Sequence, residues 1–360
     1  MVEPYNAIGL IPTFRGIRRR EEISVNLEHV HELMSAGCWL TSLDLPVKLV
    51  ALPEGTLQGF NDEIFDLDHE DYARTCCIDI PGPETDTLEK YAREFNVYII
   101  AQARARHQDL ADRYFNVGIV ISPTGEILLK SYKIAPLYSS EHSVSPHDIY
   151  DWWIDRYGNT IEAFWPVADT DIGRIGILIA NDASYPEHAR ALAMNGAEIL
   201  YRGPMPHPMT THDMAEIQNR SRALDNNVYV LAPGLGPYFP YVDSANSVDA
   251  GGGQSMIVDY KGQIIGKQPS GAASSFVSAT IDIEALRFHR ANAKVTNWMK
   301  DLRTELYDLI YRKPLYPKNL CMDRKPMVHE EYLTEVHERQ VELMHELGIW
   351  KKPTRYKKNI

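Results

Sequence analysis

Long apolar runs, an excess of basic residues and abundant cysteine are all missing from this 360-residue sequence. No run approaches the roughly 18 consecutive apolar residues of a membrane span, and the opening stretch MVEPYNAIGL does not resemble a secretory signal. Lys and Arg number 37 against 49 Asp and Glu, so the net charge is −12, which disfavours binding to a nucleic-acid backbone. We therefore expect neither a membrane nor a nucleic-acid partner.

Only four cysteines are present, Cys38, Cys76, Cys77 and Cys321. Their spacing matches neither a disulfide framework nor a zinc motif, and the 13 histidines include no HExxH pattern. The sequence therefore predicts reduced thiols, a cytoplasmic location and no bound metal.

Short β-branched runs alternate with helix-like stretches, which predicts an α/β layered protein. The expected strands cover residues 6–14, 49–52, 97–103, 115–121, 175–179, 198–201, 228–232, 255–259 and 276–281, and the expected helices 20–36, 85–94, 185–195 and 211–226. The turn sequences at 122–126 and 259–263 predict hairpins, so parts of the sheets should be antiparallel.

The alternation ends near Glu284, which predicts a domain over residues 1–285 and a C-terminal extension over 286–360. Apolar residues at one-face helical spacing favour a helix over 328–347, namely Tyr332, Val336, Leu343 and Leu347. We expect this extension to pack on the body or on a partner subunit.

Two carboxylates and a lysine stand where strands are expected to end. Glu54 follows the run Leu-Val-Ala-Leu-Pro, and a carboxylate held at a strand end could act as a general base. Lys133 follows a strand, with Glu141 eight residues later, and such a pair could stabilise an oxyanion. Taken one at a time, a turn glutamate in water and a surface Lys–Glu pair are the simpler interpretations.

A third segment turns from the buried run 175–179 into a helix through Ala180-Asn181-Asp182. Such a strand-to-helix elbow exposes one side chain and directs backbone N–H groups at an anion. Nucleophiles of several hydrolase folds occupy this kind of turn.

In their order along the chain, these segments resemble the nitrilase (carbon–nitrogen hydrolase) superfamily, in its amidase-like branch. The resemblance covers residues 5–285 and rests on Leu-Pro-Glu54, Ser-Tyr-Lys133, the elbow at Ala180, Pro186-Glu187 and Gly196-Ala-Glu-Ile-Leu200. It implies a four-layer αββα sandwich, extended here by C-terminal helices, that pairs into a homodimer or higher homo-oligomer.

One departure from the family is decisive, because Ala180 stands where the nucleophilic cysteine belongs. A methyl group cannot attack a carbonyl, and no other cysteine lies at a matching position. The chain is then either a deliberately inactivated Cys-to-Ala variant or a natural pseudoenzyme. The joint presence of Glu54, Lys133 and Glu141 favours the first interpretation.

For a form with cysteine at position 180, the resemblance implies a covalent mechanism without metal or organic cofactor. Glu54 would deprotonate the thiol, which would attack an amide carbonyl. Lys133 and the backbone N–H of Asn181 would stabilise the oxyanion, and Glu141 would hold the lysine. Ammonia or an amine would leave, and water would release the acid from the thioester.

The elbow sequence Ile-Ala-Asn-Asp resembles the elbows of amidases and N-carbamoyl amino acid hydrolases more than those of true nitrilases, and this resemblance favours an amide over a nitrile as substrate. An N-carbamoyl amino acid hydrolase is an alternative, but it needs a cation for the substrate carboxylate, and Arg190 and Arg202 are more simply structural. A non-catalytic protein that binds a small amide is the other alternative.

Aromatic residues are concentrated between the lysine and the elbow. Trp152 and Trp153 could form a pocket wall, or they could pack an ordinary helix on the body. Tyr201 begins the segment 201–207, which could line the pocket rim or form a rigid loop.

Overall fold

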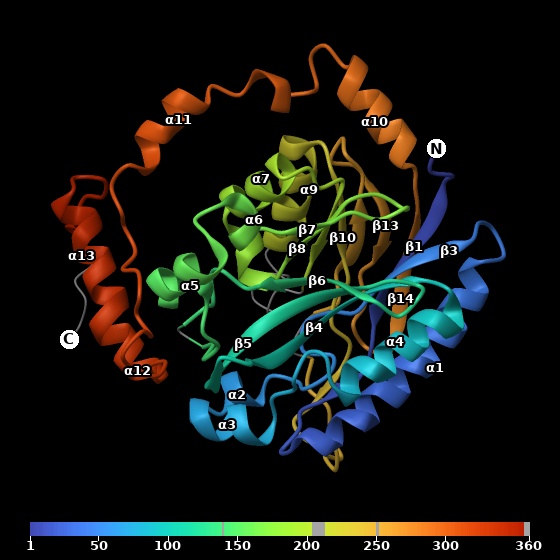
Figure 1. The fold of residues 1–360 in the computed structure, drawn as a ribbon, viewed down its shortest axis with the longest axis horizontal. Helices are drawn as coiled ribbons and strands as arrows, with labels where there is room; N and C mark the ends of the chain where they lie inside the picture. Colours follow the sequence, from blue (N-terminus) through green and yellow to red (C-terminus); the bar gives the residue numbers. More distant parts are fainter. Residues whose placement is uncertain (139, 204–212, 250–251, 356–360) are drawn as a thin grey trace.

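The computed structural model describes residues 1–360 except 139, 204–212, 250–251 and 356–360. Its first sheet has the strand order β14-β1-β3-β4-β5-β6 (Figure 1). The strands are β1 (Tyr5–Ile11), β3 (Val47–Ala51), β4 (Tyr98–His107), β5 (Leu110–Ile121), β6 (Ile127–Tyr132) and β14 (Ser275–Ile281). Strands β1, β3 and β4 run parallel, and the other pairings are antiparallel.

The second sheet has the order β13-β12-β10-β9-β8-β7. Its strands are β7 (Val167–Ala168), β8 (Ile175–Leu178), β9 (Ile199–Arg202), β10 (Tyr229–Ala232), β12 (Ser255–Val258) and β13 (Ile264–Gln268). Here β8, β9 and β10 are parallel, and β7, β12 and β13 pair antiparallel. A separate parallel pair joins β2 (Phe14–Arg15) to β11 (Tyr238–Phe239).

The two sheets pack face to face through one apolar layer. Leu49 and Ile100 of the first sheet share a buried cluster with Ile177, Ile199 and Leu231 of the second. Strands buried on both faces require continuous apolar runs, which explains why these segments lack polar alternation.

Helices cover the outer faces of both sheets. Helices α1 (Ile23–Thr41) and α4 (Pro83–Phe95) pack on the first sheet, while α7 (Pro186–Met194) and α9 (Met214–Asn226) pack on the second (Figure 1). The predicted αββα sandwich is therefore confirmed.

Local sequence signals account for several element ends. Helix α4 begins with Pro83 in its first turn and stops at Asn96, whose φ of 53° is left-handed. Helix α9 stops at Asn227 in the same conformation, with φ of 48°. Both predicted hairpins are confirmed, since β5 pairs with β6 and β12 with β13.

Short helices connect these layers. They are η1 (Arg20–Glu22), α2 (Asn61–Ile64), α3 (His69–Thr75), η2 (Pro146–Ile149), α5 (Tyr150–Tyr157), α6 (Ile161–Phe164) and η3 (Ala180–Ser184). Of the helices described, none is long and apolar enough to cross a membrane.

The C-terminal extension forms an arm that curves around the body and ends beyond α5 (Figure 1). Its elements are α10 (Ile283–Asn292), η4 (Met299–Asp301), α11 (Thr304–Tyr311), α12 (His329–Tyr332), the π-helical turn η5 (Leu333–His337) and α13 (Glu338–Glu346). The domain boundary expected at residue 285 falls inside α10. The arm returns to the body at Cys321, whose N–H donates to the Asp148 carbonyl at 2.9 Å.

Candidate active site

Glu54 is held just beyond the end of β3, where the chain leaves the sheet. The pairing continues to Leu52, whose N–H donates to the Ile100 carbonyl at 2.8 Å. Gly55 then turns the chain with φ of +77°, and a side chain there would strike the Phe60 ring at 2.5 Å. Glu54 is only 3% exposed, so its carboxylate lies inside the protein rather than in a solvated turn.

Two buried side chains, Lys133 and Asn116, link this carboxylate to that of Glu141. Lys133 follows β6 and donates through Nζ to Glu141 at 2.6 Å and to Glu54 at 3.3 Å. Asn116 of β5 donates through Nδ2 to the same two carboxylates, at 2.7 Å to Glu54 and 3.0 Å to Glu141. The structure thus brings together Glu54, Lys133 and Glu141, and Asn116 joins them.

The charges of this group stabilise one another. Burial by itself lowers the pKa of Lys133, but the carboxylates of Glu141 and Glu54 outweigh that effect and raise it above its usual value. Burial by itself raises the pKa of Glu141, but Lys133 and Arg104 hold it well below its usual range. Lys133 is therefore a fixed ammonium and Glu141 a fixed carboxylate.

A second buried layer lies behind the first. Arg104 of β4 is fully buried, donates to Asp62 at 3.3 Å and contacts Glu63. Burial, together with the charges of Glu141, Asp62 and Glu54, raises the pKa of Glu63 well above its usual value, although Arg104 opposes the shift. Four carboxylates thus face two cations here, and the protonated form of Glu63 is favoured by this environment.

The elbow carries Ala180 at the first position of η3, immediately after β8 and Ile179. Ala180 is 6% exposed and has φ of +42°, a conformation that costs energy for any residue with a Cβ. A strained position of this kind is typical of sites where function fixes the backbone.

Asp182 holds the elbow against the lysine segment. Its carboxylate accepts N–H bonds from Ala135 at 2.8 Å, Ile134 at 3.2 Å and Ile179 at 3.3 Å. The side chain of Asn181 donates to the Ala135 carbonyl at 3.0 Å, so it points at the lysine segment. These bonds fix the position of Ala180 relative to Lys133.

Gly203, one residue beyond β9, lies between the elbow and Glu54. A Cβ built on Gly203 would be 3.2 Å from the Ala180 nitrogen and 3.4 Å from Cβ of Glu54. Two residues earlier, within β9, Tyr201 is fully buried and donates its hydroxyl to the Leu52 carbonyl at 2.8 Å. Tyr201 therefore supports the chain that presents Glu54, and the rest of segment 201–207 beyond Gly203 lies outside the described residues.

A cavity of about 540 Å³ lies beside the elbow. One wall comes from the lysine segment and Asn181, and the opposite wall from the C-terminal arm. The lining includes Ile134, Pro136, Leu137, Tyr138, Asn181, Tyr185, His188, Tyr316, Tyr332, Leu333 and His337. Sequence reasoning did not associate the arm with a cavity next to the elbow.

Trp152 and Trp153 lie in a different place. Both belong to α5, and Trp153 packs edge-on against Tyr132, with ring centres 4.9 Å apart, while Trp152 packs against His107 at 5.5 Å. Trp153 lines a separate cavity of about 480 Å³. Like the lining of the cavity beside the elbow, the lining of this cavity contains none of Glu54, Lys133 and Glu141, but it also lacks Asn181. Their aromatic cluster packs α5 on the first sheet.

The two arginines considered as a carboxylate clamp have other partners. Arg202 is fully buried and donates to Asn219 and Gln218 of α9, each at 2.7 Å. Arg190 contacts the sulfur of Met299 in the arm. Both arginines thus make structural contacts.

All four cysteines are free thiols. Burial raises the pKa of Cys38 and of Cys76 to about 11, and it raises the pKa of Cys77 and Cys321 further. Since the thiolate is the nucleophile, these thiols are poorly reactive, and none of them lies at the elbow.

The fold is an αββα sandwich that encloses a buried Glu–Lys–Glu group, and sequence comparison identifies the class of protein to which it belongs. The carbon-nitrogen hydrolase family profile matches residues 13–291. The chain belongs to the carbon-nitrogen hydrolase family.

Curated relatives include formamidases from Bacillus thuringiensis and Bacillus cereus. Each is 30% identical over 193 residues, which is 53% of this chain and 51% of the relative. The match therefore spans about half the length of the curated relatives.

Solved structures share the fold. Nit3 of Saccharomyces cerevisiae, a member of branch 10 of the nitrilase superfamily, has a TM-score of 0.62 at 20% identity, over 82% of this chain and 96% of its own. A cysteine-to-alanine variant of the amidase from Nesterenkonia AN1 has a TM-score of 0.60 at 15% identity, over 85% and 97%.

Proposed function

We propose that this chain is the inactive form of an amidase that hydrolyses small linear amides, with Ala180 at the position of the nucleophilic cysteine. In the active form Glu54 is the general base, Lys133 and the backbone N–H of Asn181 bind the oxyanion, and Glu141 holds Lys133 in place. The chain as it stands binds an amide and does not turn it over. Ala180 is then either a deliberate substitution or the residue of a natural binding protein.

The observation that carries this proposal is the position of the Lys133 ammonium. It bonds both Glu54 and Glu141 inside the protein, and Gly203 and Asp182 connect the same site to the elbow. A fixed ammonium suits a carbonyl oxygen that gains negative charge, and the backbone N–H of Asn181 at the elbow would supply a second donor. A carboxylate at the same place suits removal of a thiol proton.

The comparisons support the same chemistry. The curated relatives are named formamidases. One variant of the Nesterenkonia amidase carries the acetamide moiety of fluoroacetamide, covalently added at its active-site cysteine. A cysteine-to-alanine variant of that amidase forms a complex with butyramide, and a double variant forms one with acrylamide.

Amides are favoured over N-carbamoyl amino acids because Arg190 and Arg202, the two candidates for binding a substrate carboxylate, contact other parts of the protein. Arg202 bonds α9 and Arg190 contacts the arm, so neither guanidinium presents itself to a substrate carboxylate. The N-carbamoyl alternative would be favoured if an Ala180→Cys variant preferred N-carbamoylglycine to acetamide.

Fluoroacetamide tests the nucleophile directly. The Ala180→Cys variant, incubated with this reagent, should gain one acetamide moiety per chain, at residue 180 in the peptide map. The unsubstituted chain is the matched control, because its four thiols, three buried and Cys38 half-buried, all have raised pKa values and should stay unmodified. Labelling of Cys76 or Cys77 in place of residue 180 would contradict the proposed nucleophile position.

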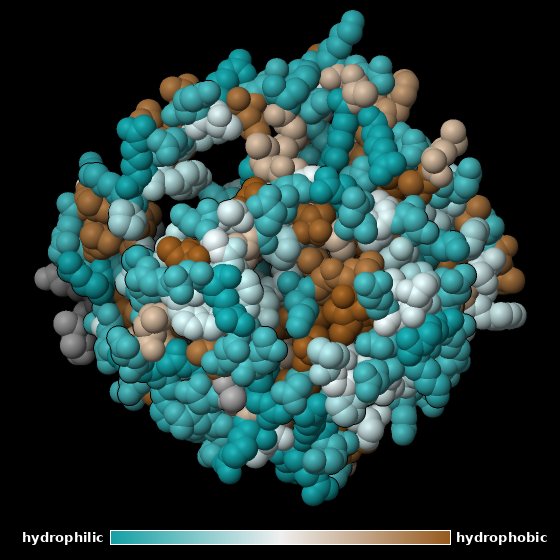
Figure 2. Space-filling view, viewed as in Figure 1, coloured by the Kyte–Doolittle hydropathy of each residue, from teal (hydrophilic) through white to brown (hydrophobic). Residues whose placement is uncertain are grey.

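We also propose that the chain forms a homodimer through its arm. Several large apolar side chains of α10 and α11 are more than half exposed: Phe288, Leu306, Leu309 and Ile310. Figure 2 shows an opening between the arm and the body, so these helices are not fully packed on their own domain. Light scattering should give a dimer mass for the chain and a monomer mass for Leu306→Glu/Ile310→Glu, and a monomeric parent would contradict the proposal.

A further inference from the structure

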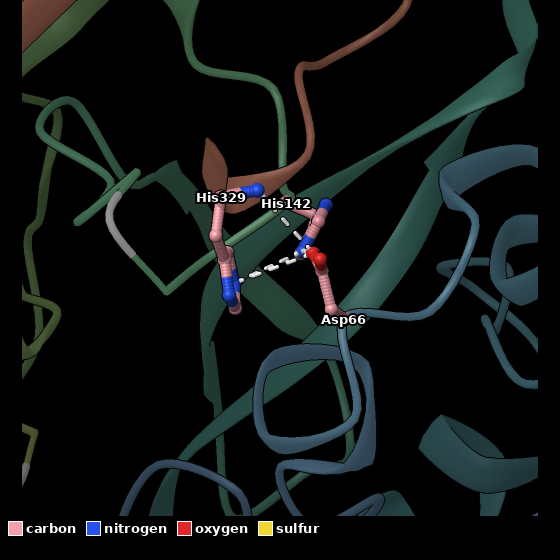
Figure 3. A group of neighbouring side chains, drawn as sticks. All are labelled: Asp66, His142 and His329. Atoms are coloured by element: carbon pink, nitrogen blue, oxygen red, sulfur yellow. Dashed lines mark hydrogen bonds and ion pairs between the residues drawn. The ribbon is translucent and has the colours of Figure 1, made fainter. Parts of the chain in front are cut away.

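Three side chains from distant segments converge on one point beside the arm (Figure 3). Asp66 follows α2, His142 follows Glu141 directly, and His329 is the first residue of α12. Nε2 of His142 lies 2.8 Å from Oδ1 of Asp66 and 3.2 Å from Nε2 of His329. Nε2 of His329 lies 3.6 Å from the same Asp66 oxygen.

Hydrogen bonds account for only part of this arrangement. Nε2 of His142 can donate to Asp66, and Nε2 of His329 can donate to the Ser140 carbonyl at 2.8 Å, which leaves the two Nε2 atoms 3.2 Å apart with no proton between them. The two imidazole nitrogens face each other, and both are directed at one carboxylate oxygen (Figure 3). A single proton can bridge only one of the three pairs at a time.

The positions of these three side chains suit metal coordination. Zinc binds imidazole nitrogen and carboxylate oxygen at about 2.0–2.2 Å, usually with tetrahedral geometry, so ligand atoms around it lie about 3.3 Å apart. The three observed separations, 2.8, 3.2 and 3.6 Å, lie around that value. Two imidazoles and one carboxylate also suit zinc or cobalt better than calcium or magnesium, which prefer oxygen ligands.

We propose that Asp66, His142 and His329 bind one divalent transition-metal ion of the zinc class, with water completing the coordination. The ion links the C-terminal arm to the loop that follows Glu141. This inference does not depend on the proposed amidase activity.

The surroundings favour a defined site over a chance contact. His142 is 1% exposed, and its carbonyl accepts a hydrogen bond from Nδ1 of His69 at 2.8 Å, which fixes the loop. The Ser140 carbonyl lies 2.8 Å from Nε2 of His329 and adds an oxygen donor at the same place. The Asp66 side chain is 41% exposed and leaves a route for the ion to enter.

The site also has a structural consequence for the cavity beside the elbow. Tyr332 and Leu333, which form part of its arm-side wall, follow His329 within one helical turn. An ion that fixes His329, which is 187 residues from His142 in sequence, therefore fixes this wall.

Cobalt and zinc binding to the full chain test the proposal. The protein, freed of any affinity tag and of metal by chelation, is titrated with CoCl₂ and then with ZnCl₂. We expect one Co²⁺ per chain with the visible absorption of a four-coordinate nitrogen–oxygen site, displacement by one Zn²⁺, and a higher Tm with zinc. An absence of stoichiometric binding would overturn the proposal.

Three substitutions locate the ion. His329→Gln and Asp66→Asn change partly exposed side chains, so the variants should fold, which circular dichroism can verify. Each should lower zinc affinity by at least about 100-fold, since even outer-shell partners contribute roughly 10- to 100-fold. His31→Gln is the matched control, because His31 also contacts a carboxylate, that of Glu94 at 2.9 Å, and its affinity should equal the parent's. Equal binding by His329→Gln and the parent would contradict the assignment.

Discussion

Lys133 and Glu141 form an ion pair inside the protein, with the ammonium 2.6 Å from the carboxylate and both side chains at most 3% exposed. Only eight residues separate them, and Asn116 from the neighbouring strand bonds the same carboxylate. Removing one partner of a buried ion pair is strongly destabilising, because the other charge is left buried without compensation. The group around Glu54 is therefore held in one arrangement before any substrate arrives.

Substitution of Lys133 should lower stability more than substitution of its exposed neighbour Lys130. Lys133→Met leaves the buried carboxylates of Glu54 and Glu141 without their cation, and we expect the free energy of unfolding to fall by about 3–5 kcal/mol. Lys130→Met, on the exposed side of β6, should cost less than about 1 kcal/mol. Urea denaturation of both variants measures the difference, and equal losses would contradict the buried-pair interpretation.

Glu63 should give the protein a characteristic pH dependence. Because burial and neighbouring carboxylates raise its pKa above the reference value of 4.5, the folded state holds a proton that the unfolded state releases. Its contribution to stability therefore falls as pH rises from 4.5 through the pKa of the folded protein. Glu63→Gln mimics the protonated form, so this variant should gain stability relative to the parent as pH rises towards neutral.

Thermal unfolding between pH 4.5 and 7.5 measures this difference. Glu346→Gln, on the exposed face of α13, is the control and should follow the parent at every pH. A Glu63→Gln variant that loses stability relative to the parent towards neutral pH would show that Glu63 is ionised beside Arg104.

A side chain at position 203 should lower the activity of the cysteine form. A Cβ at this position would lie 3.2 Å from the elbow nitrogen of Ala180 and would displace the elbow from Glu54. In an Ala180→Cys background, we expect Gly203→Ala to lower kcat/KM for acetamide at least about tenfold, because small misplacements in a site are costly. Gly37→Ala in α1, whose Cβ would meet ordinary contacts from 3.5 Å, should leave kcat/KM unchanged.

Much of the fold follows from periodicity and turn chemistry. Buried strands such as β8 and β10 are continuous apolar runs, and α4, α7 and α9 each end at an asparagine. Strands β7 and β11 have two residues each and carry no periodic signal. The helix expected over 328–347 is interrupted by a π-helical turn at Leu333–His337, which side-chain spacing alone does not indicate.

The site was only partly predictable, because its members come from separate strands. Glu54, Lys133 and Glu141 were recognisable from their order, and the structure brings them into contact. Asn116 gave a weak signal, as a polar residue within the apolar run of β5. The expected strand stops at residue 103, immediately before charged Arg104. The observed β4 continues to His107, because Arg104 is buried against Asp62 and Glu63.

The pairing of His142 with His329 had no signal in the sequence, since 187 residues separate them. Only tertiary packing of the arm shows that they converge. The same packing gives the arm a wall of the cavity beside the elbow, whereas Trp152 and Trp153, the aromatic candidates for that wall, pack α5 on the sheet.

Ammonia release by the Ala180→Cys variant tests the central claim most directly. The variant and the unsubstituted chain would be compared on formamide, acetamide, butyramide, benzamide and N-carbamoylglycine at neutral pH. The account predicts ammonia from simple amides with the cysteine variant alone, and loss of that activity on adding Glu54→Gln. Ammonia release by the unsubstituted chain, or a folded cysteine variant that stays silent on every amide, would contradict it.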